Sequence, residues 1–174
     1  MSAFIGAGIV SVAPWSDTTA FDSLTFVDVG NVSKLVPSFS EDRKTLKNYR
    51  NAAGGNYASF ARVDSAELAM EFRDLSADNL ALALWGTATT VTTTTTVEAL
   101  LSAAPVVAVK FVGVNLVDGK DVTAKFFKVR LGSPQGLDLI GEDFANMSIT
   151  GIMEADEKIV TAGKSQYFAI ALED

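Results

Sequence analysis

The sequence predicts a mainly β (α+β) protein: an antiparallel β-sandwich or barrel-like sheet with one flanking helix at about residues 76–85. Runs rich in β-branched and aromatic residues alternate between apolar and polar positions, as strands with one solvated face do. Helical spacing of apolar residues is confined to one segment. Turn-forming pairs such as Asp118-Gly119 separate the runs.

The composition favours a single domain over residues 1–174 with no catalytic chemistry. The chain is 48% hydrophobic, with a net charge of −7 and no Cys or His. Disulfides, thiol chemistry, His-based triads and ordinary zinc sites are therefore excluded, and we expect no enzyme, no metal and no cofactor. No apolar run is long enough to span a membrane. The apolar start lacks the basic residues of a signal peptide, which indicates synthesis in the cytoplasm.

The first half of the chain predicts three strands, at residues 24–31, 33–41 and 63–73. Pro37 lacks a backbone N–H, so we expect it at a bulge or on an unpaired edge. The third run alternates best, with Ala66, Leu68, Met70 and Phe72 on one side.

A helix follows at about residues 76–85. Ser76 is the expected N-cap, with Asn79 at the third helical position. The apolar stripe of Leu80, Leu84 and Trp85 is expected to pack on the sheet, and Gly86 to end the helix.

The second half predicts four further strands, at residues 105–117, 120–132, 144–157 and 165–174, for a total of about seven. Asp118-Gly119 predicts a type I′ hairpin turn, in which both residues have positive φ. The threonine-rich residues 87–97 are either a surface strand or an ordered connector.

One segment, at about residues 44–63, predicts a long loop where two residues would close the hairpin. From 44 to 62 it has no carboxylate, although the chain is acidic. Its candidate contact residues are Lys44, Lys47, Tyr49, Arg50, Gly54, Gly55, Tyr57, Phe60 and Arg62. Such side chains stack on nucleic-acid bases or anchor protein interfaces. On an acidic chain we favour a protein contact.

Two clusters of acidic residues are weaker candidates for a functional site. Glu142-Asp143 is expected to be solvated, and Glu154, Asp156 and Glu157 are either solvated or a metal site.

The order of these elements over residues 24–86 resembles tail tube proteins (major tail proteins) of long-tailed, siphovirus-type bacteriophages. The resemblance is carried by "VGNVSKLVPSFSEDRKTLKNYRNAAGG" and by the Asp-Asn-Leu-Ala helix that ends at Gly86. It implies hexameric rings stacked into a hollow tube through which DNA leaves the virion. The implied protein partners are further copies of the chain, a tail terminator, distal tail or baseplate proteins, and a tape measure in the lumen. Double-stranded DNA would pass through the tube without specific binding.

The resemblance also implies roles for two regions. The 44–63 loop would reach neighbouring subunits and the next ring. The polar strand faces would line the lumen, through Ser38, Ser40, Ser65, Glu67 and Glu71. Independently of the resemblance, residues 2–15 of the N-terminal arm (about residues 1–20) are too apolar to remain free for long, and we expect them to stay disordered only until rings stack.

Other functions stay open. The chain could be another ring or tube subunit, such as a tail terminator, a head–tail joining ring or a type VI-like secretion tube. It could also be a monomeric ligand-binding β-sandwich, and an enzyme dependent on Glu142, Asp143 or Lys164 is the most distant alternative.

Overall fold

The computed structural model describes residues 5–134, 136–137, 140 and 145–173, and is mostly antiparallel β-sheet with one α-helix in this part. The strands are β1 (Gly6–Pro14), β2 (Val27–Asp28), β3 (Val32–Lys47), β4 (Asn56–Phe72), β5 (Thr87–Val91), β6 (Thr94–Glu98), β7 (Val106–Asn115), β8 (Asp121–Leu131), β9 (Met147–Met153) and β10 (Phe168–Leu172). The α-helix is α1 (Ala77–Ala83), and a 3-10 turn η1 covers Phe21–Ser23. The predicted mainly β class is confirmed.

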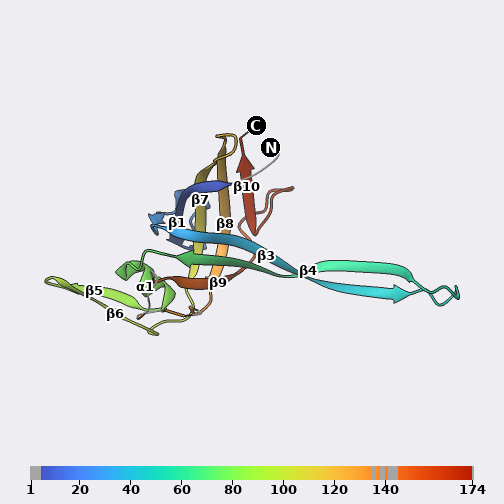
Figure 1. Ribbon diagram of the computed structural model, residues 1–174, viewed down its shortest axis with the longest axis horizontal. Coiled ribbons are helices and arrows are strands. Elements are labelled where there is room, and N and C mark those ends of the chain that lie inside the picture. The colour runs from blue at the N-terminus through green and yellow to red at the C-terminus, as the bar shows by residue number, and fades with distance from the viewer. Residues whose placement is uncertain (1–4, 135, 138–139, 141–144, 174) are drawn as a thin grey trace.

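Strand β8 joins two layers of the large sheet. The strand order is β2-β1-β7-β8-β9-β4-β3. Residues 122–126 of β8 pair with β10, whereas residues 129–131 pair with β9. Because the partner of β8 changes along its length, the layer with β9, β4 and β3 turns away from the layer with β1, β7 and β10, and their strands cross (Figure 1).

The hydrophobic core lies between these layers. Strand β4 contributes Leu68, Met70 and Phe72, all buried, as its alternation predicts. Phe126 of β8 and Ile149 of β9 lie in the same cluster. Pro37 is on β3, which ends the sheet order, so its missing N–H is tolerated at an edge.

The prediction of an N-terminal arm that waits for assembly is wrong for residues 6–14. These residues form β1, which pairs with β7 from Gly6 opposite Asn115 to Pro14 opposite Val107. Val10 and Val12 are buried in the core. The segment is apolar because it is a central strand; residues 1–4 lie outside the described part.

The prediction of a long irregular loop at residues 44–63 is also wrong. Strands β3 and β4 continue as a paired hairpin far beyond the body, and only residues 48–55 connect them (Figure 1). The antiparallel pairing of the two strands satisfies their facing backbone groups even without a core beneath.

Helix α1 begins where predicted, because the Ser76 hydroxyl accepts a hydrogen bond from the Asn79 N–H at 3.2 Å. Its end differs from the prediction. Trp85, at φ 54°, takes the left-handed conformation expected of Gly86. Gly86 serves close packing instead, since a Cβ there would lie 1.9 Å from the Glu98 carbonyl oxygen. Leu80 packs against the core, Leu84 is half-buried, and the indole of Trp85 donates to the Gly132 carbonyl oxygen at 3.3 Å.

The strand count exceeds the predicted seven. The additional strands are β1, β5 and β6, of which the last two form a separate two-stranded sheet. Of the two alternatives for the threonine-rich segment, the structure therefore shows surface strands. The Asp118-Gly119 hairpin exists between β7 and β8, but only Gly119 has positive φ (75°), so the turn is not type I′. The Gly119 N–H instead bonds to the Asn115 carbonyl oxygen at 2.8 Å across a longer turn.

Candidate functional site

The candidate site is the outer part of the β3–β4 hairpin, residues 41–63, which we call the ribbon. Cross-strand pairs run from Glu41 opposite Val63 to Leu46 opposite Ala58. A register shift between Ser40 and Glu41 marks the point where the ribbon leaves the body. Seven strand residues at about 3.3 Å each carry it about 23 Å outward before the tip.

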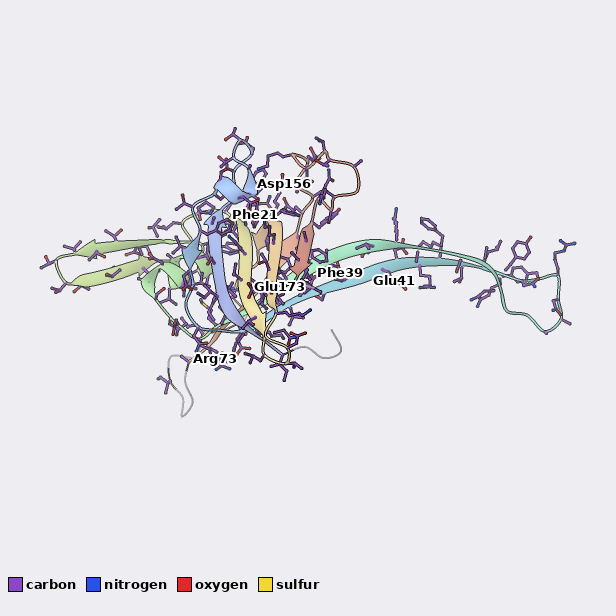
Figure 2. All side chains as sticks on the ribbon, turned by 90° about the horizontal axis from the view of Figure 1, so that it is seen from above. Phe21, Phe39, Glu41, Arg73, Asp156 and Glu173 are labelled. Carbon is purple, nitrogen blue, oxygen red and sulfur yellow. The ribbon has the colours of Figure 1, made fainter. Side chains whose placement is uncertain are left out.

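The ribbon packs against nothing else in the described chain. Figure 2 shows its side chains projecting on all sides beyond Phe39 and Glu41. Tyr49 is 87% exposed and Phe60 is 66% exposed. The full set of large apolar side chains exposed on it is Leu46, Tyr49, Tyr57, Phe60 and Val63. A two-stranded hairpin is marginally stable in water without a third strand or an apolar support, so this surface is suited to a partner.

The ribbon is basic, and its charges are partly paired along its length. Five basic and two acidic residues lie in residues 41–63, a net charge of +3. The carboxylate of Asp42 is 3.2 Å from the Lys44 ammonium and 3.5 Å from the Arg62 guanidinium, and Glu41 pairs with Arg43 at 2.8 Å. These exposed pairs contribute little to stability, so they leave the basic groups available to a partner's carboxylates.

The tip, residues 48–55, is an ordered turn. The Asn48 N–H bonds to the Gly55 carbonyl oxygen, and the Asn51 side chain accepts a hydrogen bond from the Ala53 N–H at 3.1 Å. Gly54 and Gly55 have φ of 71° and 99°, a backbone region that glycine adopts without strain. Tyr49 and Arg50 are therefore presented on a defined scaffold.

The structure brings the predicted lumen residues together on one face of the β3–β4 pair in the body. Ser38 lies opposite Glu67, and Ser40 opposite Ser65 with a hydroxyl–hydroxyl hydrogen bond of 2.7 Å. Glu71 lies on the same face, opposite Lys34. The sequence analysis did not predict that this face continues onto β9. There, Ser148 is opposite Glu71, Thr150 opposite Ala69, and Ile152 opposite Glu67.

Glu71 is held by a local network, so the face is less acidic than two free carboxylates would make it. Its carboxylate pairs with the Arg73 guanidinium at 2.6 Å and accepts a hydrogen bond from the Ser33 hydroxyl at 2.9 Å. The Asn146 amide also donates to it at 3.4 Å. With Lys34 and Arg73 beside Glu67 and Glu71, the charges of the face balance, and hydroxyls dominate the rest.

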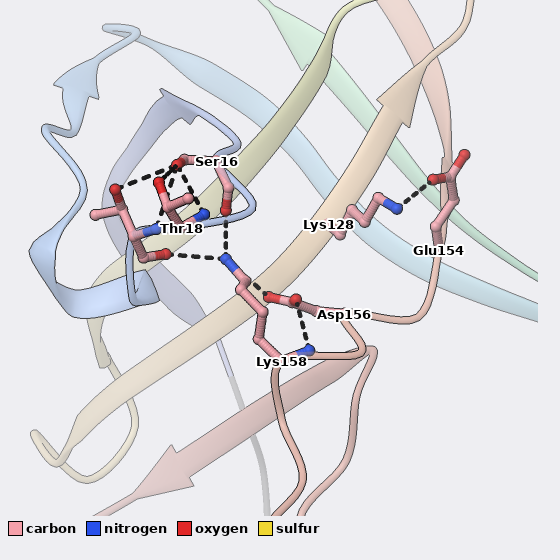
Figure 3. Close-up of polar contacts among 7 residues, drawn as sticks. Ser16, Thr18, Lys128, Glu154, Asp156 and Lys158 are labelled. Atoms are coloured by element: carbon pink, nitrogen blue, oxygen red, sulfur yellow. Dashed lines mark hydrogen bonds and ion pairs between the residues drawn. The ribbon is translucent and has the colours of Figure 1, made fainter.

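The second acidic cluster has basic partners within the body. Glu154 lies 3.0 Å from the Lys128 ammonium (Figure 3) and 2.5 Å from the Arg130 guanidinium. The hydrogen bond from Arg130 holds the pKa of Glu154 below its usual value, against the opposing effect of burial. The same contact raises the pKa of Arg130. This carboxylate is therefore an ion-pair partner and is poorly suited to receive a metal.

Asp156 is buried and fixes the loop after β9. Its carboxylate accepts a hydrogen bond from the Lys158 N–H at 3.3 Å and lies 3.7 Å from the Lys158 ammonium. That ammonium also donates to the carbonyl oxygens of Ser16 and Thr19 (Figure 3). The group thus ties two loops together; Glu142 and Asp143 lie outside the described residues.

Sequence reasoning missed two buried asparagines. The Asn79 amide donates to the carbonyl oxygens of Val29 and Asp74 at 2.8 and 2.7 Å. Asn115, fully buried, accepts from the Ile5 N–H and donates to Asp118. Only long-range contacts distinguish such residues from surface turn residues, so no local pattern would have identified them.

An apolar pocket of about 490 Å³ lies between residues of β1, β3, β8 and β10. Its apolar lining includes Leu35, Phe111, Phe126, Ile170 and Leu172. In the described part of the chain, no three carboxylates gather as a metal site. Within the same residues, no helix is long and apolar enough to cross a membrane.

A family model described as "Protein of unknown function UCP028589" matches residues 3–100 and 92–171, nearly the whole chain. The chain therefore belongs to this family. No curated protein matches it. The family description specifies no activity, so the function must be argued from the geometry above.

Proposed function

We propose that this member of the family is the repeating subunit of a hollow tube, the tail tube of a long-tailed bacteriophage, assembled from stacked hexameric rings that deliver DNA. On this proposal the chain is a structural virion protein that needs no catalytic residue and no cofactor. Its partners are its own copies first, and then the proteins that end the tube, connect it to the host-binding end and fill its lumen.

The observation that carries the proposal is the uncovered ribbon. A hairpin that extends about 23 Å from the body, with Tyr57 and Phe60 exposed, lacks the third strand or apolar support that such hairpins need. Its ordered tip shows that it is not a flexible linker. We infer that another protein surface covers it in the working state.

A second copy of the chain is the partner that the charges favour. The ribbon carries +3 and the whole chain −7, so the rest of the chain carries −10. The basic ribbon of one copy and the acidic body of another therefore attract each other. Because the two surfaces differ, the contact is heterologous, and such contacts close into rings or continue as filaments.

The polar face around Ser38, Ser40, Ser65 and Glu67 is the proposed lumen surface. Hydroxyls and internally balanced charges offer DNA phosphates few cations to bind, and Glu67 has no ion pair among the described residues. DNA would therefore slide past this face rather than adhere to it.

Electron microscopy and sedimentation of the purified full chain test the assembly. We expect open-ended hollow tubes or stacked rings whose amount rises with concentration. A double variant, Tyr57→Ser with Phe60→Ser, should lose assembly and remain a folded monomer. Val160→Ser is the matched control, since Val160 is 86% exposed on the body and its loss should leave assembly intact. A wild-type chain that stays monomeric at millimolar concentration would refute the proposal.

The lumen role has its own test, in particles that carry the variant tube. Glu67→Lys should slow DNA release, because a cation on the face would bind phosphate. Lys164→Glu, on a body loop, is the control for a changed charge elsewhere. Unchanged release with Glu67→Lys would place this face outside the lumen.

Single rings instead of open-ended tubes would favour a terminator or joining ring. The apolar pocket favours a different second candidate, a monomeric module that binds a small apolar ligand. That candidate predicts a stable monomer and quenching of a bound apolar dye by Leu35→Trp in the pocket lining. Assembly that is insensitive to such a dye would argue against it.

A further inference from the structure

The threonine-rich hairpin β5–β6 projects from the body on the side opposite to the ribbon. Both views agree on this placement (Figures 1 and 2). It forms a two-stranded sheet of its own, with Thr87 opposite Glu98 at the root and Val91 opposite Thr94 at the turn. The body therefore carries one two-stranded arm at each of two opposite ends.

The root of β5–β6 is fixed, so the arm has a defined direction. Gly86 lies so close to the Glu98 carbonyl oxygen that no side chain would fit between them. The Leu100 N–H bonds to the Leu84 carbonyl oxygen at 2.8 Å, and the Leu101 N–H to that of Trp85 at 3.0 Å. These bonds attach both ends of the hairpin to the end of α1.

Apart from their short length and Glu98 at the root, the edges of β5–β6 lack the features that normally prevent edge-to-edge pairing. No charged residue and no proline lies between Gly86 and Val97, and the pairing shows no register shift. The ribbon, in contrast, has charged residues on both strands, which disfavour pairing with a second, like-charged ribbon, and its register is unbroken only over residues 41–46, between two register shifts. Natural proteins use charges, prolines and bulges to protect edges, so their absence in β5–β6 is typical of a strand edge that pairs with another strand.

The outward backbone groups of the hairpin can be assigned from its turn. A two-residue connection closes on the hydrogen-bonded pair Val91 and Thr94, and such pairs alternate along a hairpin. The N–H groups of the intervening residues therefore point outward: Ala88 and Thr90 on one edge, Thr95 and Val97 on the other. All four residues lie within five-residue strands, which are short enough to pair within residues 41–46 of the ribbon, between its two register shifts.

We propose that an open edge of β5–β6 pairs with the ribbon of a second copy, so that the two hairpins form one four-stranded sheet between subunits. This inference rests on the tube function proposed above and names the surface that receives the ribbon. The ribbon's charge of +3 opposes ribbon–ribbon pairing, whereas β5–β6, whose one charged residue is Glu98 at the root, imposes no such repulsion. Four strands also reach the size at which a sheet is stable in water.

The opposite placement of the two arms gives the pairing a direction. A copy that receives a ribbon at β5–β6 still presents its own ribbon at the other end. The contact therefore repeats from copy to copy without closing on a pair.

The first test blocks the outward edge of each strand at one cross-strand pair, Thr90 and Thr95. Thr90→Pro with Thr95→Pro removes two outward N–H groups and retains the inward bonds, and should raise the critical concentration for assembly by roughly tenfold or more. Thr90→Ala with Thr95→Ala is the matched control, because it removes the 2.9 Å hydroxyl contact but keeps both N–H groups. Assembly of the proline variant at the wild-type concentration would overturn the inference.

A second test does not depend on proline being tolerated. Because the chain has no cysteine, Thr95→Cys and Ser59→Cys supply the only thiols in one chain, and a short bis-maleimide joins whichever of them lie close together across copies. We expect a ladder of covalent multimers from assembled protein, and neither single variant should give it. Dimers from Thr95→Cys alone would show that β5–β6 pairs with itself and refute the inference.

The two proposals fail in different ways. Tubes that form but give no ladder would refute the pairing and leave the tube function standing. A chain that forms no tubes, rings or ladder would refute both.

Discussion

The two halves of the β3–β4 hairpin are both paired strands but have opposite environments. In the inner half, Phe72 is completely buried and Leu68 and Met70 lie in the core. In the outer half, Phe60 and Val63 lie on the same strand but are about two-thirds exposed. The comparison shows that a strand pattern reports extended pairing, whereas burial depends on what lies across the sheet.

The largest expected effect separates the two halves directly. Phe72→Ala should destabilise the isolated chain by about 3–5 kcal/mol, because it leaves a cavity between tightly packed neighbours. Phe60→Ala should change the unfolding free energy by less than about 0.5 kcal/mol, since its ring is exposed. Chemical denaturation of both variants as monomers measures the contrast. Equal losses would show that the ribbon packs on its own body in solution.

The next effect concerns Asn79 of α1, which contacts the backbone just before β3 and just after β4, at the body end of the hairpin. Asn79→Ala should cost about 2–3 kcal/mol, because the buried carbonyl groups of Val29 and Asp74 would lose their donor. Asp78→Ala, one residue earlier and exposed, is the control and should have a much smaller effect. Thermal unfolding of the two variants checks this. A small loss for Asn79→Ala would mean that water replaces the amide.

A weaker effect concerns the ion pair between Glu154 and Arg130 on the body. The pKa of Glu154 is lowered in the folded state, so the stability from its pair with Arg130 is present above the ordinary value of about 4.5 and is lost as pH falls through the lowered value. The melting-temperature difference between wild type and Glu154→Gln should therefore be largest near pH 7 and shrink toward pH 3. A difference that does not change with pH would exclude this ion pair as its source.

The smallest effect lies in the outer half. Asp42→Asn removes the partner of Lys44 and Arg62, yet should change monomer stability by less than about 0.5 kcal/mol because both basic groups are largely solvated. It should, however, alter the salt dependence of assembly, since the ribbon becomes more basic. Light scattering across salt concentrations measures this. Unchanged salt dependence would argue against an electrostatic contact of the ribbon.

Much of the fold could be predicted from local patterns. The alternation of residues 63–73 identified the core strand, and Ser76 identified the start of α1. The basic and aromatic residues of the ribbon were found for the same reason: they stand out within a short window. The prediction failed where a short apolar run allowed two readings, as at residues 6–14, which form β1 instead of a free arm.

The sequence by itself determined which residues extend, which turn and where the basic aromatic surface lies, because these depend on neighbours a few positions away. Only the tertiary structure decided that β8 joins two layers, that Asn79 is buried, and that the core stops under β3–β4 at about Ser40. These features depend on contacts between residues far apart in the chain. No local pattern encodes where a core ends, and that boundary is what leaves the ribbon uncovered.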